Sequence, residues 1–503
     1  MHAHGDTRGL RWISTQRLCS LLAFLMLVLG GTLFIQFVSE RHNLYVAIAI
    51  LLFVPALLLA LPFAVGQVGR KLWALRKQLA WWHAVWLLVF CSALVYRTRE
   101  SGAVTEEPVD AWAFFRITLV TTTAFILIAR LALRLTPWVN SLFRGLVGAL
   151  GVFALVSVSS TLWSIYPALT LYKSLEYLVD VALIAAILVS VRSPNAFKSL
   201  FDWTWTLYGF LVASVWLGAL VWPGQALIRS VGLIGVQLYG VVPNIHANTV
   251  GECGAILAIV AFSRLLARSR GVRELAWNML VLSASLATLV MSQTRSAIAG
   301  FMLGVLVVMV ASKRCGVAAA LVMSVILLLV TTDAASLFVA YSQRGQSPEL
   351  LQSLSGRLPW WKLSWEKFLD QPLTGYGAYA GGRFAVLAEL GQSEAASVHN
   401  SYLEIVLGTG ILGLGPVLVA LFGTWLILIR RLRTYSLSSF DRPFIVEALG
   451  VLTVVTVRSF FTSGLVWNHS IVFLLIVGYA ELLRRRPMDG GTSAQYSVSP
   501  AGG

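Results

Sequence analysis

The sequence predicts an all-α, polytopic transmembrane helical bundle of about 12–14 spans with one long outer loop. Three observations predict this fold class. The chain of 503 residues is 58% hydrophobic and only 12% charged, and its mean hydropathy is +0.79, a composition that soluble globular domains do not show. Apolar runs of about 20 residues, long enough to cross a bilayer, recur along the chain. The segments between these runs are mostly short, and many are rich in Lys and Arg.

The formal net charge of +16 is explained by membrane topology, because Lys and Arg gather in short loops as the positive-inside rule describes. We therefore expect no nucleic acid partner. Cys19, Cys91, Cys253 and Cys315 lie in or beside apolar runs without paired spacing, which indicates neither a disulfide framework nor a metal site. No convincing small-residue cleavage site follows the first apolar run, so we interpret it as a retained helix.

Each candidate span has about the length needed to cross the hydrocarbon core. The pair at 276–291 and 295–311 is short and tightly joined, so the count extends down to about twelve. The spans lie near residues 17–38, 44–66, 79–96, 113–133, 145–163, 173–191, 201–222, 248–266, 276–291, 295–311, 316–332, 399–430, 444–461 and 469–483.

The loops determine the predicted orientation, since Lys and Arg in short loops favour the cytoplasm. With the N-terminus inside, every loop on the inner side is basic, as in 70–77, 264–273 and 484–486. The alternate loops are poor in basic residues or carry mixed charge, as in 97–110. Both termini are therefore predicted to be cytoplasmic.

One connection, residues 333–398, is far longer than the others and falls on the outer side. Long ordered loops are uncommon unless they bind or cover something. Its part 356–368 has Trp361, Trp365 and Phe368 at helical spacing, which predicts an amphipathic helix at the membrane interface. The run 371–377 (Gln-Pro-Leu-Thr-Gly-Tyr-Gly) then predicts a turn.

Polar groups that could carry chemistry converge on the outer side in this topology. Arg229, Asn244 and Arg295 lie at outer turns, and Arg357 and His399 belong to the long outer segment. An arginine fork matches the oxygens of a phosphate group. A histidine beside such a cluster is suited to proton transfer near neutral pH.

Each of these residues also has a structural alternative. Arg295 at a helix end could snorkel to the interface, and Arg229 could be a loop charge. Arg357 could pair with a glutamate of its own segment, Glu349 or Glu366. His399 could cap or pack the helix that follows it.

The other polar residues within or near the spans carry weaker signals. Glu176, Asp180 and Glu252 are expensive in lipid and should face the bundle interior as hydrogen-bond partners. His246 and His469 fall on the outer side and are weaker candidates than His399. The sequence contains no Walker loop, dinucleotide fingerprint or HExxH motif. Metal-free chemistry on a phosphate-bearing lipid is the simplest remaining enzyme hypothesis.

Four short motifs in fixed order resemble the O-antigen ligase and polymerase superfamily. They are Thr-Arg-Ser at 294–296, Ser-Gly-Arg at 355–357 followed by Trp360-Trp361, Pro-Leu-Thr-Gly-Tyr-Gly at 372–377, and His-Asn-Ser-Tyr-Leu-Glu at 399–404 followed by Gly-Ile-Leu-Gly at 410–413. The resemblance covers residues 292–415. Before it, only Arg229 and Pro243-Asn244 match, and the earlier spans match in topology alone.

The resemblance implies a multi-pass enzyme of the bacterial inner membrane that uses an undecaprenyl-diphosphate-linked oligosaccharide as donor at the periplasmic face, with no metal or other cofactor. By motif, Arg295 and Arg357 would hold the diphosphate with Arg229 as a third arginine, and His399 would be the general base. Asn400, Tyr402, Glu404 and Asn244 would support the acceptor side.

The implied reaction is an inverting glycosyl transfer, and the form of the motifs favours polymerisation of exopolysaccharide or O-antigen repeat units. The alternative within the family is ligation to a lipid A core acceptor. A transporter or flippase of the same lipid-linked sugars is the alternative of another class; it should show internal repeats, interrupted helices and charges near the midplane. Other expected partners are membrane lipids and other polysaccharide-assembly proteins.

This interpretation divides the chain into three parts. Residues 1–291 form the N-terminal transmembrane scaffold. Residues 292–486 form the ligase- or polymerase-like region with its periplasmic loop 333–398, and residues 487–503 form a disordered cytoplasmic tail.

Overall fold

A computed structural model describes the chain at residues 79–94, 109–191, 194–230, 233–267, 271–344, 346–392, 394–434, 441–467 and 470–485, together with residues 69 and 106. The predicted spans 17–38 and 44–66 and the predicted tail 487–503 lie outside these residues. The fold is all-α, as the sequence predicted, with one short β-hairpin.

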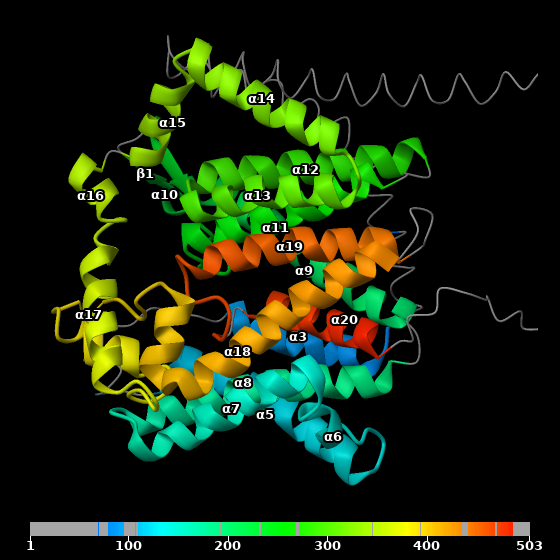
Figure 1. Cartoon of the computed structure of the whole chain (residues 1–503), viewed down its shortest axis with the longest axis vertical. Coiled ribbons are helices and arrows are strands. Elements are labelled where there is room, and N and C mark those ends of the chain that lie inside the picture. Colours follow the sequence, from blue (N-terminus) through cyan, green and yellow to red (C-terminus); the bar gives the residue numbers. More distant parts are fainter. Residues whose placement is uncertain are drawn as a thin grey trace, which may run out of the picture.

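Helices make up most of the described chain (Figure 1), and their bounds follow the apolar runs of the sequence. The elements are α3 (Trp81–Leu94), α5 (Ala111–Ala132), α6 (Val139–Leu142), α7 (Gly145–Ser159), η1 (Ser160–Trp163), α8 (Pro167–Ser190), α9 (Pro194–Val221), α10 (Pro223–Ala226), β1 (Leu227–Arg229), β2 (Val236–Leu238), α11 (Ala247–Leu266), α12 (Val272–Ser292), α13 (Arg295–Ala311), α14 (Cys315–Thr331), α15 (Ala334–Gln343), α16 (Pro348–Gln352), α17 (Arg357–Asp370), η2 (Gly381–Leu387), α18 (Ser401–Thr434), α19 (Arg442–Ser459) and α20 (Ile471–Arg484).

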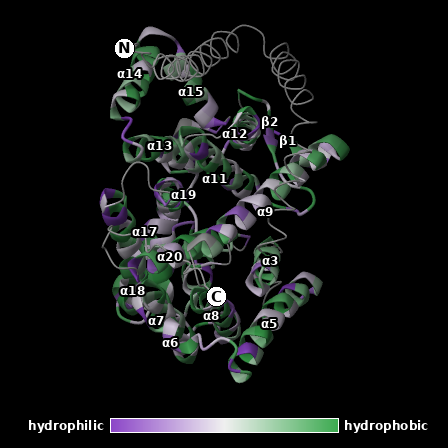
Figure 2. Cartoon of the chain, turned by 90° about the vertical axis from the view of Figure 1, so that its right-hand side faces the viewer, coloured by the Kyte–Doolittle hydropathy of each residue, from purple (hydrophilic) through white to green (hydrophobic). Residues whose placement is uncertain are grey.

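Six helices of the described chain are long and apolar enough to cross a membrane, and the bent pair α14–α15 would make a seventh. The other predicted spans that fall within the described residues are helical too, but several do not meet the same test. The helices α3 and α13 have only 14 and 17 residues, and α8 and α19 carry three charged side chains each within the tested length. Hydrophobic residues dominate the helices in Figure 2, as expected of a protein embedded in lipid.

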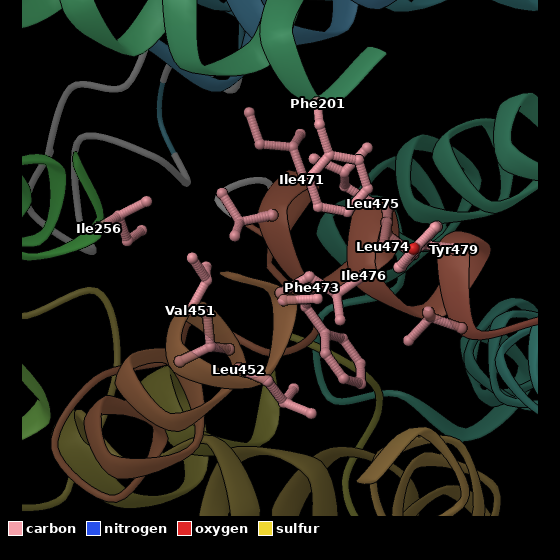
Figure 3. Packing of buried hydrophobic residues seen from close by; sticks show 14 of the residues in the cluster. Phe201, Ile256, Val451, Leu452, Ile471, Phe473, Leu474, Leu475, Ile476 and Tyr479 are labelled. Atoms are coloured by element: carbon pink, nitrogen blue, oxygen red, sulfur yellow. The ribbon is translucent and has the colours of Figure 1, made fainter. Parts of the chain in front are cut away.

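The long helices lie roughly side by side, and the loops gather at the two ends of the bundle (Figure 1). α11 packs on α12, α13 and α19, while α18 packs on α7, α19 and α20. The interior of the bundle is formed by aliphatic and aromatic side chains, with α20 at the centre (Figure 3). Ile471, Phe473, Leu475 and Tyr479 of α20 are all at most 2% exposed.

Several charged side chains within the helices are paired inside the bundle, which lowers the cost of burying their charge. Glu176 of α8 accepts two hydrogen bonds of 2.7 Å from Arg116 of α5 and one of 3.2 Å from Lys173. Glu252 of α11 forms an ion pair of 3.2 Å with Arg458 of α19. Asp180 is also buried, and its Oδ1 atom has no hydrogen-bond partner in the described chain.

The long connection 333–398 folds into α15, α16, α17 and the segment η2 along one end of the bundle (Figure 1). The prediction of a helix over 356–368 is confirmed by α17. Ser364 and Phe368 lie on its buried face, while Trp365 is 53% exposed. The residues of the predicted apolar face therefore differ in burial within the structure, from half-buried Trp361 and exposed Trp365 to buried Phe368.

The predicted turn 371–377 has a specific structural role, because its backbone forms hydrogen bonds with α18 where that helix is interrupted. Gly410 has φ of 60° and ψ of −157°, which no helix contains. On either side of the break, Tyr376 N donates to Leu407 O at 2.7 Å and Ile411 N donates to Pro372 O at 2.9 Å. The turn therefore supplies the backbone partners that the interrupted helix lacks.

Candidate functional site

Three of the residues predicted to act together, Arg295, Arg357 and His399, lie at helix ends that meet at one end of the bundle. Thr294 Oγ1 donates to Ala247 O at 3.0 Å, which aligns the starts of α13 and α11. Arg458 Nη1 donates to Asn248 O at 3.1 Å and brings in the end of α19. At the opposite end, Arg442 Nη2 donates to Ala311 O at 2.8 Å and joins the start of α19 to the end of α13.

Arg295 is the first residue of α13 and contacts the long connection instead of extending into solvent. Its Nη2 atom donates to Gln346 Oε1 at 2.7 Å and to Gln343 O at 3.3 Å, and its Nη1 atom donates to Ser355 Oγ at 3.4 Å. Its Nε atom is buried without a hydrogen-bond partner in the described chain. The guanidinium is thus held in place, and its Nε atom can still donate a hydrogen bond to a ligand.

Arg357 begins α17 and is partly buried. Its Nη1 atom donates to Phe461 O at 3.1 Å, beyond the end of α19. Among the described residues it forms no ion pair with Glu349 or Glu366, the structural alternative that the sequence left open. Burial, Arg344 and Arg458 lower the pKa of Arg357 to about 10, so it stays charged at neutral pH.

His399 lies just before α18 in a sharply turned backbone, with φ of +55°. Several contacts hold this turn. Val398 N donates to Glu404 Oε1, and Trp361 Nε1 donates to Val398 O at 2.9 Å. Asn400 Oδ1 accepts from Tyr402 N at 3.0 Å and caps the helix.

The ring of His399 is partly buried and stacks on Trp360, with 6.2 Å between centroids and 24° between planes. Within the described chain, neither of its ring nitrogens has a hydrogen-bond partner. Burial, Arg357 and His246 lower the pKa of His399 to about 3. Its imidazole is therefore neutral at physiological pH and can accept a proton or a hydrogen bond.

Two further arginines, which the sequence motifs did not indicate, lie in the same cluster as Arg295, Arg357 and His399. Arg344 follows α15, and its Nε atom is buried without a hydrogen-bond partner in the described chain. The same is true of Nε of Arg458, which is 3% exposed. Arg458 lies at the outer end of a predicted span, and this position could have identified it from the sequence. Arg344 lies within the long connection, where only the fold shows its direction.

The other predicted residues have distinct places. Arg229 is exposed at the end of β1, opposite Val236, and no contact links it to the cluster within the described chain. Asn244 is exposed in the turn after β2. The ring of Tyr402 packs on Phe460, with 4.8 Å between centroids. The weaker candidate His246 is exposed before α11 and lies near enough to His399 to help lower the pKa of that residue. His469 lies outside the described residues.

Comparison with curated proteins gives no match. Residues 279–418 match the family model described as O-antigen ligase. This match contains Arg295, Arg344, Arg357, His399 and Glu404, and agrees closely with the interval 292–415 indicated by the motifs. Residues 279–418 of this chain are therefore similar to the O-antigen ligase family, which supports the resemblance that the motifs indicated.

Proposed function

We propose that the protein is a membrane glycosyltransferase of the inner membrane that polymerises glycan repeat units carried on undecaprenyl diphosphate, at the periplasmic face. Arg295 and Arg357 bind the diphosphate of the donor, and His399 is the general base. The observation that carries the proposal is the convergence of unpaired guanidinium groups and a neutral imidazole at one end of the bundle. The family match supplies the reaction class.

The chemistry follows from these roles. A hydroxyl of the acceptor glycan attacks the anomeric carbon of the donor as the bond from that carbon to the diphosphate oxygen breaks. His399 takes the hydroxyl proton, and the arginines stabilise the negative charge that grows on the departing lipid diphosphate. Attack on the side opposite the leaving group inverts the anomeric carbon.

The site also couples donor binding to the basicity of His399. In the free protein, the charge of Arg357 helps to keep the pKa of His399 low. A bound diphosphate places negative charge beside the same arginine and offsets its effect. We therefore expect His399 to become a stronger base once the donor is bound.

A transporter of lipid-linked sugars remains the alternative of another class. Two features resemble those of transporters, namely the break in α18 and the buried charges on α8. The backbone at the break is occupied by the turn 372–377, however, so it is not free to coordinate a ligand. The unpaired cations instead gather at one end of the bundle, which favours the enzyme.

The test is a comparison of three variants in cells. We expect His399→Ala and Arg295→Ala to reach the membrane at wild-type level and to accumulate unextended lipid-linked glycan at the outer face. A general base contributes roughly 10²–10⁴-fold to the rate. Lys362→Gln, which removes an exposed charge from α17, is the control and should leave glycan length unchanged.

The products distinguish the alternatives. Single repeats on lipid A core indicate loss of a polymerase, while long chains left on the carrier lipid indicate loss of a ligase. Lipid-linked glycan trapped at the inner face indicates a transporter. If both site variants leave glycan length and attachment unchanged, the assignment of His399 and Arg295 is wrong.

A further inference from the structure

We propose that Arg344 is an additional anion-binding residue, carried to the site by the bent pair α14–α15, and that it binds the second phosphate group of a diphosphate donor. This inference rests on the proposed function, which it extends to a residue that neither the motifs nor the family description assigns. It follows from geometry, unsatisfied hydrogen bonding and charge.

The geometry places Arg344 beside Arg295. Arg295 Nη2 donates to Gln343 O at 3.3 Å and to Gln346 Oε1 at 2.7 Å, and these two residues bracket Arg344 in the chain. Tyr341 OH donates to Val290 O at 2.9 Å and fixes the end of α15 on α12. Arg344 is therefore positioned by contacts to the elements that carry the site.

The bend between α14 and α15 explains how the chain reaches this position. The two helices are related by an angle of 93°, and α15 passes over the end of the bundle toward β1 (Figure 1). Arg344 then ends α15 with φ of +51°, in a region that residues with long side chains seldom adopt. A left-handed residue is a common helix C-cap, so Arg344 ends α15 and redirects the chain there.

The unsatisfied hydrogen bonding indicates a missing acceptor. Nε atoms of Arg295, Arg344 and Arg458 are buried and have no partner in the described chain. Native proteins seldom leave buried donors unpaired. Three such atoms on three different elements at one site indicate a ligand with several acceptor oxygens.

The charges identify the class of that ligand. In the described chain, neither Arg295, Arg344 nor Arg357 has a carboxylate partner, whereas Arg458 is paired with Glu252 at 3.2 Å. Like charges held together without counterions are unfavourable. A single phosphodiester has too little charge to balance three arginines, and the two linked phosphates of a diphosphate ester fit better.

The experiment measures anion binding directly, without activity. The purified full-length protein in nanodiscs is titrated with inorganic pyrophosphate and, at equal ionic strength, with inorganic phosphate. We expect wild type to prefer pyrophosphate. We expect Arg344→Gln to bind pyrophosphate roughly ten- to hundredfold more weakly, since a charge-assisted contact is lost. Lys362→Gln is the charge-matched control and should bind as wild type does.

Thermal unfolding without ligand separates this role from a structural one. If Arg344 only stabilised the fold, Arg344→Gln would lower the Tm of the protein. If Arg344 binds anions, its removal relieves the repulsion among the neighbouring arginines, and the Tm of Arg344→Gln should equal or exceed that of wild type. If Arg344→Gln does not reach the membrane, Arg344→Lys is measured, with at least about threefold weaker pyrophosphate binding expected because the planar fork is lost.

Two results overturn the inference, and they are distinguishable. If wild type binds pyrophosphate and the Arg344 variant binds it equally well, Arg344 has no part in the site while the proposed function stands. If wild type binds neither anion, the anion site is absent and the proposed function fails with it.

Discussion

Replacing Glu404 tests whether the turn of His399 must be held in place for activity. The carboxylate is 4% exposed and accepts the hydrogen bond of Val398 N, one residue before His399. Its other oxygen faces Gly382, where an added Cβ atom would lie 2.5 Å from Glu404 Oε2. Glu404 is therefore a positioning residue in our interpretation.

The magnitude follows from what the turn loses. Glu404→Ala leaves a buried N–H without an acceptor, at a cost of about 1–3 kcal/mol. The left-handed backbone of His399 is itself unfavourable by about 1–3 kcal/mol, so the lost bond is large enough for the turn to relax. A shift of the base by about 1 Å lowers the rate on the order of 10²-fold. Glu404→Gln keeps an acceptor of the same size and should retain most activity.

The assay is glycosyl transfer by purified protein in nanodiscs, with thermal unfolding as the check on folding. We also expect Glu404→Ala to add little in a His399→Ala background, because it acts through the histidine. Equal losses for Glu404→Gln and Glu404→Ala in stable proteins would refute positioning and indicate a direct role of the carboxyl group. A full further loss in the His399→Ala background would refute it as well.

Two more predictions follow from the same region. Between pH 6.5 and about 3 the unfolded chain binds a proton at His399 that the folded chain does not, so stability should fall as pH falls through this window. In kcat/KM profiles the acid limb should lie well below pH 6.5, and Arg357→Gln should move it to higher pH; an unmoved limb would contradict the assigned cause. Gly410→Ala should reduce the amount of folded protein, because φ is +60° and its Cβ atom would lie 2.2 Å from Leu373 C. Gly415→Ala in the same helix, with open space around it, is the control, and equal thermal stability of the two variants would show that the break in α18 does not need glycine.

The sequence by itself determined most of the helices and predicted the general region of the candidate site. Apolar runs are long and strongly patterned, so α5, α7, α9, α11, α12 and α18 begin and end within a few residues of the predicted bounds, except that α9 begins at Pro194, about two turns before the predicted start at 201. Topology then placed Arg295, Arg357 and His399 on one side. Local periodicity also predicted α17, because its apolar positions recur at helical spacing.

Only the tertiary structure decided which of these groups meet. The direction of Arg344 depends on the bend between α14 and α15, and the pairing of Arg458 with Glu252 depends on the packing of α19 against α11. The turn 372–377 forms hydrogen bonds at the break in α18. The sequence pattern of α18 does not reveal that break. Periodicity reports which face of an element is apolar; it does not report which distant element covers that face. The contacts that assemble this site are nearly all of that distant kind.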